Sequence, residues 1–269
     1  MAVEGVCCIC GESAELSFEH VPPRAAFNDK RIFEADIDAL LQGKWSPDER
    51  IEQGKYKQRG AGRYSLCGGC NNITGKWYGE GYVQVAKQAM ILLHASKGTM
   101  SLAYPYMMYP LRFLKQIAVM FFSACGPGFQ AQNQDLVRFV LNRDEQQLPP
   151  RYQFLAYLHH PTASTCIRQS GLTVVMNTDG KQCLFAEIAF PPFGLIMSID
   201  RPPIHQDLCN ITRLSQYKFK TWDIVYLKLP VFPVTTWLPG DFRTADQVKR
   251  DVDQNRKVGS IFLGDKVPL

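Results

Sequence analysis

Two pairs of cysteines have the residue type and the spacing of a metal site. Cys7 and Cys10 lie near the start of the chain, and Cys67 and Cys70 follow after residues 11–66. Two thiolates three positions apart can hold one ion, and four thiolates close a tetrahedral shell around Zn²⁺. Cys8 lies inside the first pair and could replace a neighbour, although Cys7 and Cys10 have the standard spacing. We therefore predict a structural zinc on Cys7, Cys10, Cys67 and Cys70, with unmetallated buried thiols as the alternative.

A closed shell of four cysteines leaves no position for water, so chemistry would depend on neighbouring side chains. His20 follows Glu19 and precedes Val21, Pro22 and Pro23, and the prolines restrict the path of the chain after the pair. With an unperturbed pKa of about 6.5, His20 can accept a proton from water at neutral pH. Glu19 offers the hard oxygen ligand that Mg²⁺ or Mn²⁺ prefers.

A third polar side chain follows the second cysteine pair. Asn71 comes directly after Cys70, where we expect a helix to begin, and its amide oxygen is another hard ligand. A shared zinc would hold Glu19 and His20 next to Asn71 although they are far apart in the sequence. Asn72 is the alternative ligand, since the start of a helix is uncertain by a residue.

Length and composition are those of a globular protein. The chain has 269 residues, 46% of them hydrophobic, and a net charge of +5, which permits a nucleic-acid partner without requiring one. Nine cysteines form an odd number, and no signal peptide is visible, so we expect a reducing compartment and a cytoplasmic location. The longest apolar run, residues 117–125, is too short to cross a bilayer, so we predict a buried core helix and no membrane contact.

The pattern of apolar residues changes twice along the chain. Residues 82–96, 110–125 and 133–143 have helical spacing and helix-terminating residues, whereas short apolar runs at 151–160, 172–178, 183–190, 193–200 and 221–232 indicate strands. A polar helix is expected at 244–257. We predict an α+β protein in which a zinc-stabilised module (1–97) precedes a helical connecting segment (98–150) and a β-rich accessory domain (151–269). The hinge would lie near 98–109 or 145–151.

The N-terminal residues resemble a known family. The pattern Cys-x-x-Cys, then Leu-Ser-x-Glu-His-Val-x-Pro, then Leu-Cys-x-x-Cys-Asn-x-x-Thr-Gly-Lys-Trp is similar to that of HNH endonucleases, and closest to a bacterial subgroup with Glu-His-Val-x-Pro and Cys-x-x-Cys-Asn motifs. The likeness covers roughly the first 80 residues. It implies a treble-clef ββα-metal fold, with Glu19 and Asn71 as ligands of a catalytic Mg²⁺ or Mn²⁺ and His20 as the general base.

One position departs from the family pattern. Members often have a central asparagine about nine residues before the helix asparagine, where it braces the hairpin that carries the histidine. Counting back from Asn71 gives Gly62 instead. Neighbouring Arg63 or Tyr64 would then have to brace the loop, or the basic segment at 54–63 would shift the register.

Basic residues near these motifs are candidates for contact with nucleic acid. Lys and Arg side chains pair with phosphates with little regard to sequence, and the candidates are Arg24, Lys55, Lys57, Arg59, Arg63 and Lys76. The expected function is metal-dependent hydrolysis of phosphodiester bonds in DNA, with RNA as the alternative substrate. Such an enzyme would suit a conditional defence effector. The C-terminal region is a candidate for homodimerisation. The rival hypothesis is a noncatalytic zinc-stabilised module, a degenerate nuclease that binds nucleic acid or protein.

Overall fold

The computed structural model describes residues 2–34, 54–96, 98–159, 167–176, 180–201, 204–236, 238–244, 246–251 and 253–254. Helices and strands are mixed along this part of the chain, as expected. The strands are β1 (Val3–Val6), β2 (Ser13–His20), β3 (Ile32–Glu34), β4 (Lys55–Lys57), β5 (Gly62–Cys67), β6 (Ser101–Met108), β7 (Tyr152–His159), β8 (Arg168–Gln169), β9 (Thr173–Met176), β10 (Gln182–Phe190), β11 (Phe193–Ile199), β12 (Cys209–Asn210) and β13 (Asp223–Phe232). The helices are α2 (Gly68–Thr74), α3 (Glu80–Ala95), α4 (Pro110–Cys125), α5 (Phe129–Gln132) and α6 (Gln134–Leu141), with a π-turn η1 (Gly75–Gly79) and a 3₁₀ turn η2 (Thr212–Gln216).

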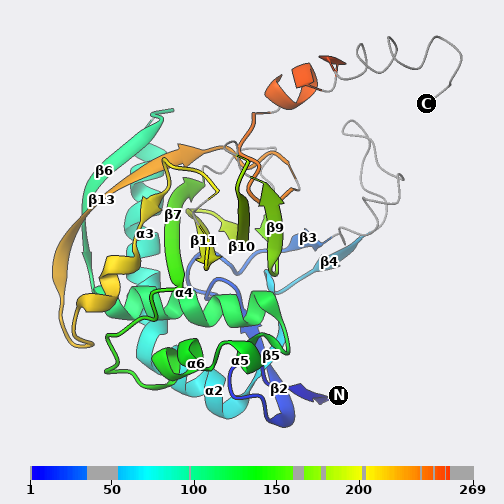
Figure 1. Cartoon of the computed structure of the whole chain (residues 1–269), viewed down its shortest axis with the longest axis vertical. Helices are drawn as coiled ribbons and strands as arrows, with labels where there is room; N and C mark the ends of the chain where they lie inside the picture. The colour runs from blue at the N-terminus through cyan, green and yellow to red at the C-terminus, as the bar shows by residue number, and fades with distance from the viewer. Residues whose placement is uncertain are drawn as a thin grey trace, which may run out of the picture.

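A small antiparallel sheet with the order β1-β2-β5 begins the fold. Its last strand leads directly into α2, and η1 joins α2 to α3, so residues 68–95 form one continuous helical segment. A second, two-stranded sheet of β3 and β4 extends to the right in Figure 1. The predicted helix at 82–96 is therefore confirmed, but helical structure begins at Gly68, three residues before Asn71, because Cys67 caps it.

The larger sheet has eight strands, six of which follow the order β6-β13-β7-β11-β10-β8, while β12 pairs with β7 and β9 pairs with β10. All of its pairs are antiparallel except the short contact between β13 and β7. The five predicted strand regions correspond to β7, β9, β10, β11 and β13. Residues 101–108, which we assigned to a hinge and a helical segment, instead form β6, which pairs with β13 along its whole length.

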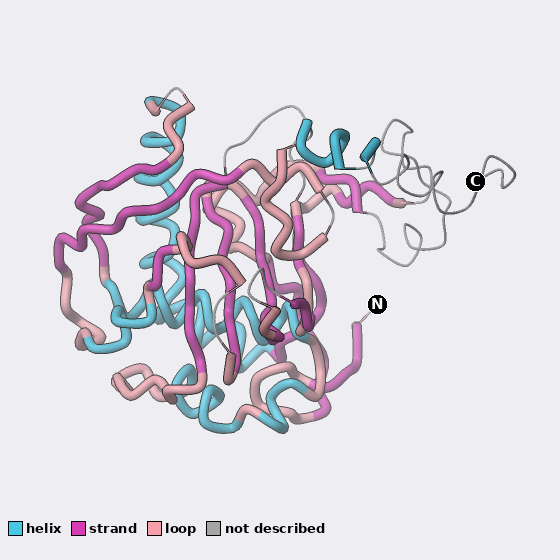
Figure 2. Tube along the Cα trace, turned by 45° about the horizontal axis from the view of Figure 1, so that its top comes forward, coloured by secondary structure: helices cyan, strands magenta, loops and turns pink. Residues whose placement is uncertain are grey.

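Helix α4 lies at the centre of the molecule. In Figure 1 it crosses below the upright strands of the large sheet and above α2, α5 and α6, and Figure 2 shows the same layering from another side. Fourteen of its sixteen residues are buried, as expected for a helix that is apolar on all sides. One buried cluster extends from Cys7 through α4 to Leu229, so side chains from all three predicted segments pack together. The predicted core helix is confirmed; the domain boundaries stay a prediction.

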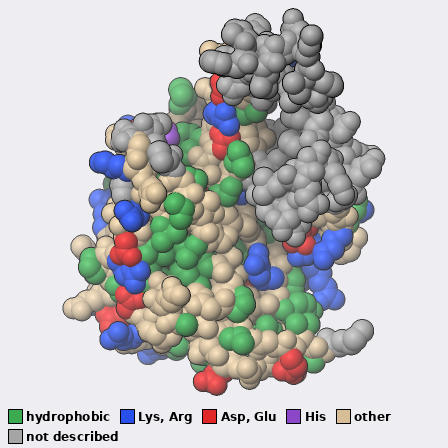
Figure 3. All heavy atoms as spheres, turned by 45° about the vertical axis from the view of Figure 1, so that its right-hand side comes forward, with side chains coloured by type: hydrophobic (Ala, Val, Ile, Leu, Met, Phe, Trp, Pro, Cys, Tyr) green, Lys and Arg blue, Asp and Glu red, His purple; other side chains and the backbone are tan. Residues whose placement is uncertain are grey.

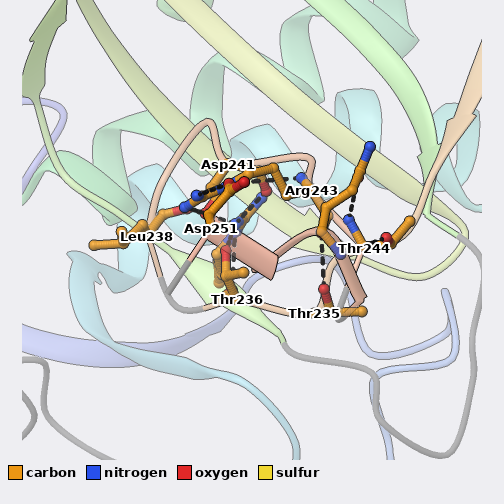
Figure 4. A network of polar contacts seen from close by, with 9 residues as sticks. Thr235, Thr236, Leu238, Asp241, Arg243, Thr244 and Asp251 are labelled. Carbon is orange, nitrogen blue, oxygen red and sulfur yellow. Dashed lines mark hydrogen bonds and ion pairs between the residues drawn. The ribbon is translucent and has the colours of Figure 1, made fainter. Parts of the chain in front are cut away.

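The opposite face of the large sheet carries a second buried cluster, which the chain after β13 covers. Within it, Arg168 and Glu187 form a buried ion pair of 2.9 Å, and Tyr157 donates to the same carboxylate at 2.7 Å. Arg168 also donates to the carbonyl of Leu238 at 2.5 Å. In the following loop, Arg243 bonds to neighbouring aspartates (Figure 4). These contacts hold the chain after β13 against the sheet.

Residues 246–251 are helical, in agreement with part of the predicted helix at 244–257, whose end lies outside the described residues. Among the helices of the described ranges, none combines the length and apolar character that a membrane span requires.

Candidate metal and catalytic site

The four predicted cysteines come together. The sulfur atoms of Cys7, Cys10, Cys67 and Cys70 all lie within 4.8 Å of one another, and the sulfurs of Cys10 and Cys67 are 3.9 Å apart. A tetrahedral zinc shell with bonds of about 2.3 Å has edges of about 3.8 Å, so this donor set fits Zn²⁺. Cys8 does not belong to the group. The sequence prediction of a cluster of four cysteines is confirmed, and its geometry is compatible with a structural zinc.

Each cysteine pair lies on a turn that its own backbone bonds define. In the first, the amide of Gly11 donates to the carbonyl of Cys7 at 2.9 Å, and Gly11 adopts a φ of 79°, which favours glycine. In the second, Cys67 caps α2 and its sulfur accepts from the amide of Cys70 at 3.4 Å. One pair therefore joins β1 to β2, and the other joins β5 to the helix.

The electrostatics of the cluster favour a cation. A hydrogen bond with Cys70 lowers the pKa of Cys7 to about 4, so one thiolate forms readily. The same contact raises the pKa of Cys70, and burial raises that of Cys10. A second negative charge among four close sulfurs is thus opposed unless a positive ion compensates it. A Zn²⁺ ion bound by the four sulfurs would supply that charge.

Glu19 lies near the end of β2 and is almost buried, with 8% of its surface exposed. Within the described residues its carboxylate has neither a hydrogen bond nor an ion pair. Burial alone raises the pKa of Glu19 to about 7. A desolvated carboxylate without a cationic partner is a suitable ligand for a divalent metal ion, which would take the place of the lost water.

Asn71 lies in the first turn of α2 and bonds to the same face of β2. Its Nδ2 donates to the hydroxyl of Ser17 at 2.9 Å, and that hydroxyl donates to the carbonyl of Leu66 at 2.9 Å. Because the proton of Ser17 is already used, its oxygen must accept, which fixes the orientation of the amide. No described residue bonds to Oδ1 of Asn71. Ser17 and Glu19 are two positions apart on one strand and face the same side, so Asn71 approaches the side that carries Glu19.

His20 faces the other side of the strand, with Phe18. Its Nε2 lies 3.0 Å from the carbonyl oxygen of Arg59. A carbonyl can only accept, so Nε2 carries a proton and the neutral ring keeps its lone pair on Nδ1. Burial lowers the pKa of His20, and the charges of Arg24 and Arg59 act in the same direction, while the bond to Arg59 opposes them. The ring is therefore mostly neutral at pH 7, as a general base must be.

The hairpin has a brace that the sequence analysis missed. Asn28 is fully buried, and its Nδ2 donates to the carbonyls of Pro22 and Ala61 while its Oδ1 accepts from the amide of Ala61, each at 2.7 Å. These bonds tie the segment after His20 to the start of β5. The sequence signal for this brace was that an asparagine follows soon after two prolines, because asparagine side chains often form hydrogen bonds with nearby backbone groups.

Gly62 is the position where we noted that the family asparagine is absent. It pairs with His20, and a Cβ added there would lie 2.2 Å from the carbonyl oxygen of Glu19. The two strands approach too closely for any side chain at this position. In this hairpin the brace therefore comes from Asn28 rather than from residue 62, Arg63 or Tyr64.

The predicted nucleic-acid contacts have different environments. Arg24, Lys55, Arg59, Arg63 and Lys76 are exposed. Lys57 is half-buried and forms an ion pair of 2.6 Å with Glu34, so its charge is already compensated. The segment at 54–63, predicted as a basic loop or hairpin tip, includes strand β4 and a turn. Figure 3 shows Lys and Arg side chains in several groups on one face of the molecule, at its left-hand and right-hand sides.

Comparison of the chain with models of protein families, with curated proteins and with solved structures found no match.

Proposed function

We propose that this protein is a metal-dependent endonuclease of the HNH type that hydrolyses phosphodiester bonds in DNA. The observation that carries the proposal is the position of the cysteine cluster, which ties β2, with Glu19 and His20 at its end, to the first turn of α2, with Asn71. The order of cysteine turn, hairpin, cysteine turn and helix resembles that of treble-clef zinc modules. Structural zinc would hold these elements together without taking part in the reaction.

Each proposed site residue has one role. Because His20 ends β2 and faces away from Glu19, the proposal requires the phosphate to lie across the end of this strand, between the two faces. There Nδ1 of His20 takes the proton of the attacking water, because Nε2 is occupied by its bond to the carbonyl of Arg59. Glu19 and the Oδ1 of Asn71 hold Mg²⁺ or Mn²⁺. When bound, this ion supplies electrostatic stabilisation of the phosphate and the leaving oxygen. Arg24 and Arg59 form no ion pair with any acidic group in the described ranges, and they contact the phosphates on either side.

The rival is a noncatalytic zinc-stabilised module that binds nucleic acid or protein. It needs the four cysteines but neither His20 nor an accessible ligand at Glu19. The low exposure of Glu19 favours this reading, since an ion can reach the carboxylate from few directions. The buried, unpaired state of the same carboxylate favours the enzyme, because a purely structural position would be better filled by an uncharged side chain.

Cleavage of supercoiled plasmid by zinc-loaded protein, with Mg²⁺ or Mn²⁺ added, separates the two hypotheses. We expect nicking by the wild type and a loss of about 10²-fold or more in His20→Ala, with zinc content unchanged. His94→Ala is the matched control, because His94 is an exposed histidine on α3. If the zinc-loaded wild type cuts neither DNA nor RNA with either ion, or if His20→Ala cuts as fast as the wild type, the enzyme proposal is wrong.

A further inference from the structure

Three rings lie together on the face of the β2–β5 hairpin that carries His20. The centroids of the Phe18 and His20 rings are 4.9 Å apart, and those of Phe18 and Tyr64 are 5.5 Å apart, both in edge-on contact. Phe18 is partly covered by its two neighbours, whereas Tyr64 exposes 46% of its surface. An exposed aromatic ring therefore lies one side chain away from the proposed general base.

An irregularity in β5 places Tyr64 on this face. Ser17 pairs with Leu66, but the next residue, Phe18, pairs with Tyr64, so Ser65 is an extra residue in β5. Ser65 faces inward and its hydroxyl donates to Ser123 of α4 at 2.9 Å. Bulges of this kind change the direction in which neighbouring side chains point. Here the bulge sets Tyr64 opposite Phe18, whose ring lies between those of Tyr64 and His20, and the Tyr64 ring remains open to solvent.

Positive charge surrounds the same face. Arg24 and Arg59 are exposed, and both lie close enough to His20 for their charges to act on it. By the alternation of side chains along a strand, Glu19 lies on the opposite side of β2, and the charges that lower the pKa of His20 are those of Arg24 and Arg59. The face thus combines cationic groups that suit phosphates with an aromatic ring that suits a base.

We propose that this face binds a single-stranded nucleic acid, with an unpaired base stacked on Tyr64 and the adjacent phosphate beside His20. The inference rests on the proposed function and names the substrate class of the same site. In a regular duplex both faces of every base are covered by neighbouring bases, so a ring on a sheet surface gains a stacking partner only where a base is unpaired. Arg24 and Arg59 then hold the backbone on either side, which makes binding dependent on salt.

Tyr56 offers a matched comparison. It exposes 55% of its surface, more than Tyr64, but the guanidinium of Arg31 lies 3.6 Å from the centre of its ring and Phe33 contacts it edge-on. One face of the Tyr56 ring is therefore already occupied. A role that depends on stacking belongs to Tyr64, whereas a general effect of losing a surface tyrosine would be the same at both positions.

The test is binding of labelled oligonucleotides by fluorescence anisotropy, with zinc-loaded protein and without Mg²⁺ or Mn²⁺. Single-stranded DNA, single-stranded RNA of the same sequence and linear duplex DNA are compared. We expect the preferred single strand to bind at least about 10-fold more tightly than the duplex, and Tyr64→Ala to lose about 10-fold for that strand alone. Tyr64→Phe and Tyr56→Ala should bind as the wild type does. The DNA and RNA arms identify the sugar.

The inference would be overturned if duplex DNA bound as tightly as either single strand. It would also be overturned if Tyr64→Ala and Tyr56→Ala lost the same amount of affinity for the preferred single strand. Thermal melting and zinc content of Tyr64→Ala show whether the variant is folded. The binding expected of Tyr64→Phe, equal to that of the wild type, does not depend on whether Tyr64→Ala folds. Failure of the two proposals is distinguishable. If the wild type binds single strands through Tyr64 but cuts nothing, this inference is retained and the enzyme proposal is lost. If the wild type cuts nucleic acid but Tyr64→Ala binds single strands as tightly as the wild type does, the enzyme proposal is retained and this inference is lost.

Discussion

Replacement of Glu19 by glutamine should stabilise the protein when no divalent ion is added. The folded state keeps this carboxylate almost out of water and raises its pKa from 4.5 to about 7. A group whose pKa is raised on folding binds protons more tightly in the folded state, so its burial opposes folding increasingly as the pH rises from 4.5 through 7. Glutamine has a similar shape and no charge, and it removes this opposition.

The size of the effect follows from the two pKa values. At about 1.4 kcal/mol per pKa unit, the difference corresponds to about 3 kcal/mol at pH 8 and about 1 kcal/mol at pH 5. The buried amide of glutamine must still find hydrogen bonds, so about 3 kcal/mol is the upper end of the gain. Added Mn²⁺ should reverse the order of stability, because it would bind the folded wild type and not the variant.

Urea unfolding followed by tryptophan fluorescence at pH 8 and pH 5 measures these differences, in buffers without a chelator so that the zinc is retained. Glu15→Gln is the matched control, because Glu15 lies on the same strand but is exposed. Its free energy of unfolding should be close to that of the wild type at both pH values. Equal effects of the two substitutions, or a Glu19→Gln gain that does not shrink at pH 5, would show that the Glu19 carboxylate is not desolvated.

Three other substitutions test the supports of the site. Cys70→Ser should lower zinc content, measured by atomic absorption, together with the melting temperature, because it removes one of four clustered sulfurs. Asn28→Ala should lower the free energy of unfolding in urea by about 3 kcal/mol with zinc retained, because three buried backbone groups lose their partner. Gly62→Asn, which restores the family residue, should destabilise the hairpin through its clash with Glu19, whereas Gly79→Ala, where an added Cβ meets nothing within 4 Å, should not. A Gly62→Asn protein as stable as wild type, or zinc loss in Asn28→Ala as large as in Cys70→Ser, would contradict these roles.

Features that depend on residues close together in the sequence, such as helix α4 and the cysteine pairs, could be predicted from the sequence. Helix α4 begins with a proline at its first turn and ends before Gly126, and its apolar residues cover every side, so its limits and its burial followed from the sequence. The cysteine pairs were equally informative, because four thiols at metal spacing have few other structural uses. The position of Asn71 near the cluster followed from its neighbour Cys70.

Contacts between distant residues were not visible in the sequence. We assigned residues 101–108 to a hinge and a helical segment, but they form β6 at the edge of the large sheet, where Pro105 is tolerated. Its partner β13 lies more than a hundred residues later. Asn28 and Ala61 are 33 positions apart, so the bonds that brace the hairpin have no local signal. The bulge that aims Tyr64 depends in the same way on the register between β2 and β5.

The most direct test of the proposed metal centre is anomalous X-ray scattering from crystals soaked in Mn²⁺ above pH 7. We predict two distinct sites: zinc among Cys7, Cys10, Cys67 and Cys70, and manganese in contact with the carboxylate of Glu19 and the side chain of Asn71. A zinc signal at the four cysteines with no manganese at Glu19 and Asn71 would contradict a metal-dependent nuclease and leave the zinc-stabilised binding module.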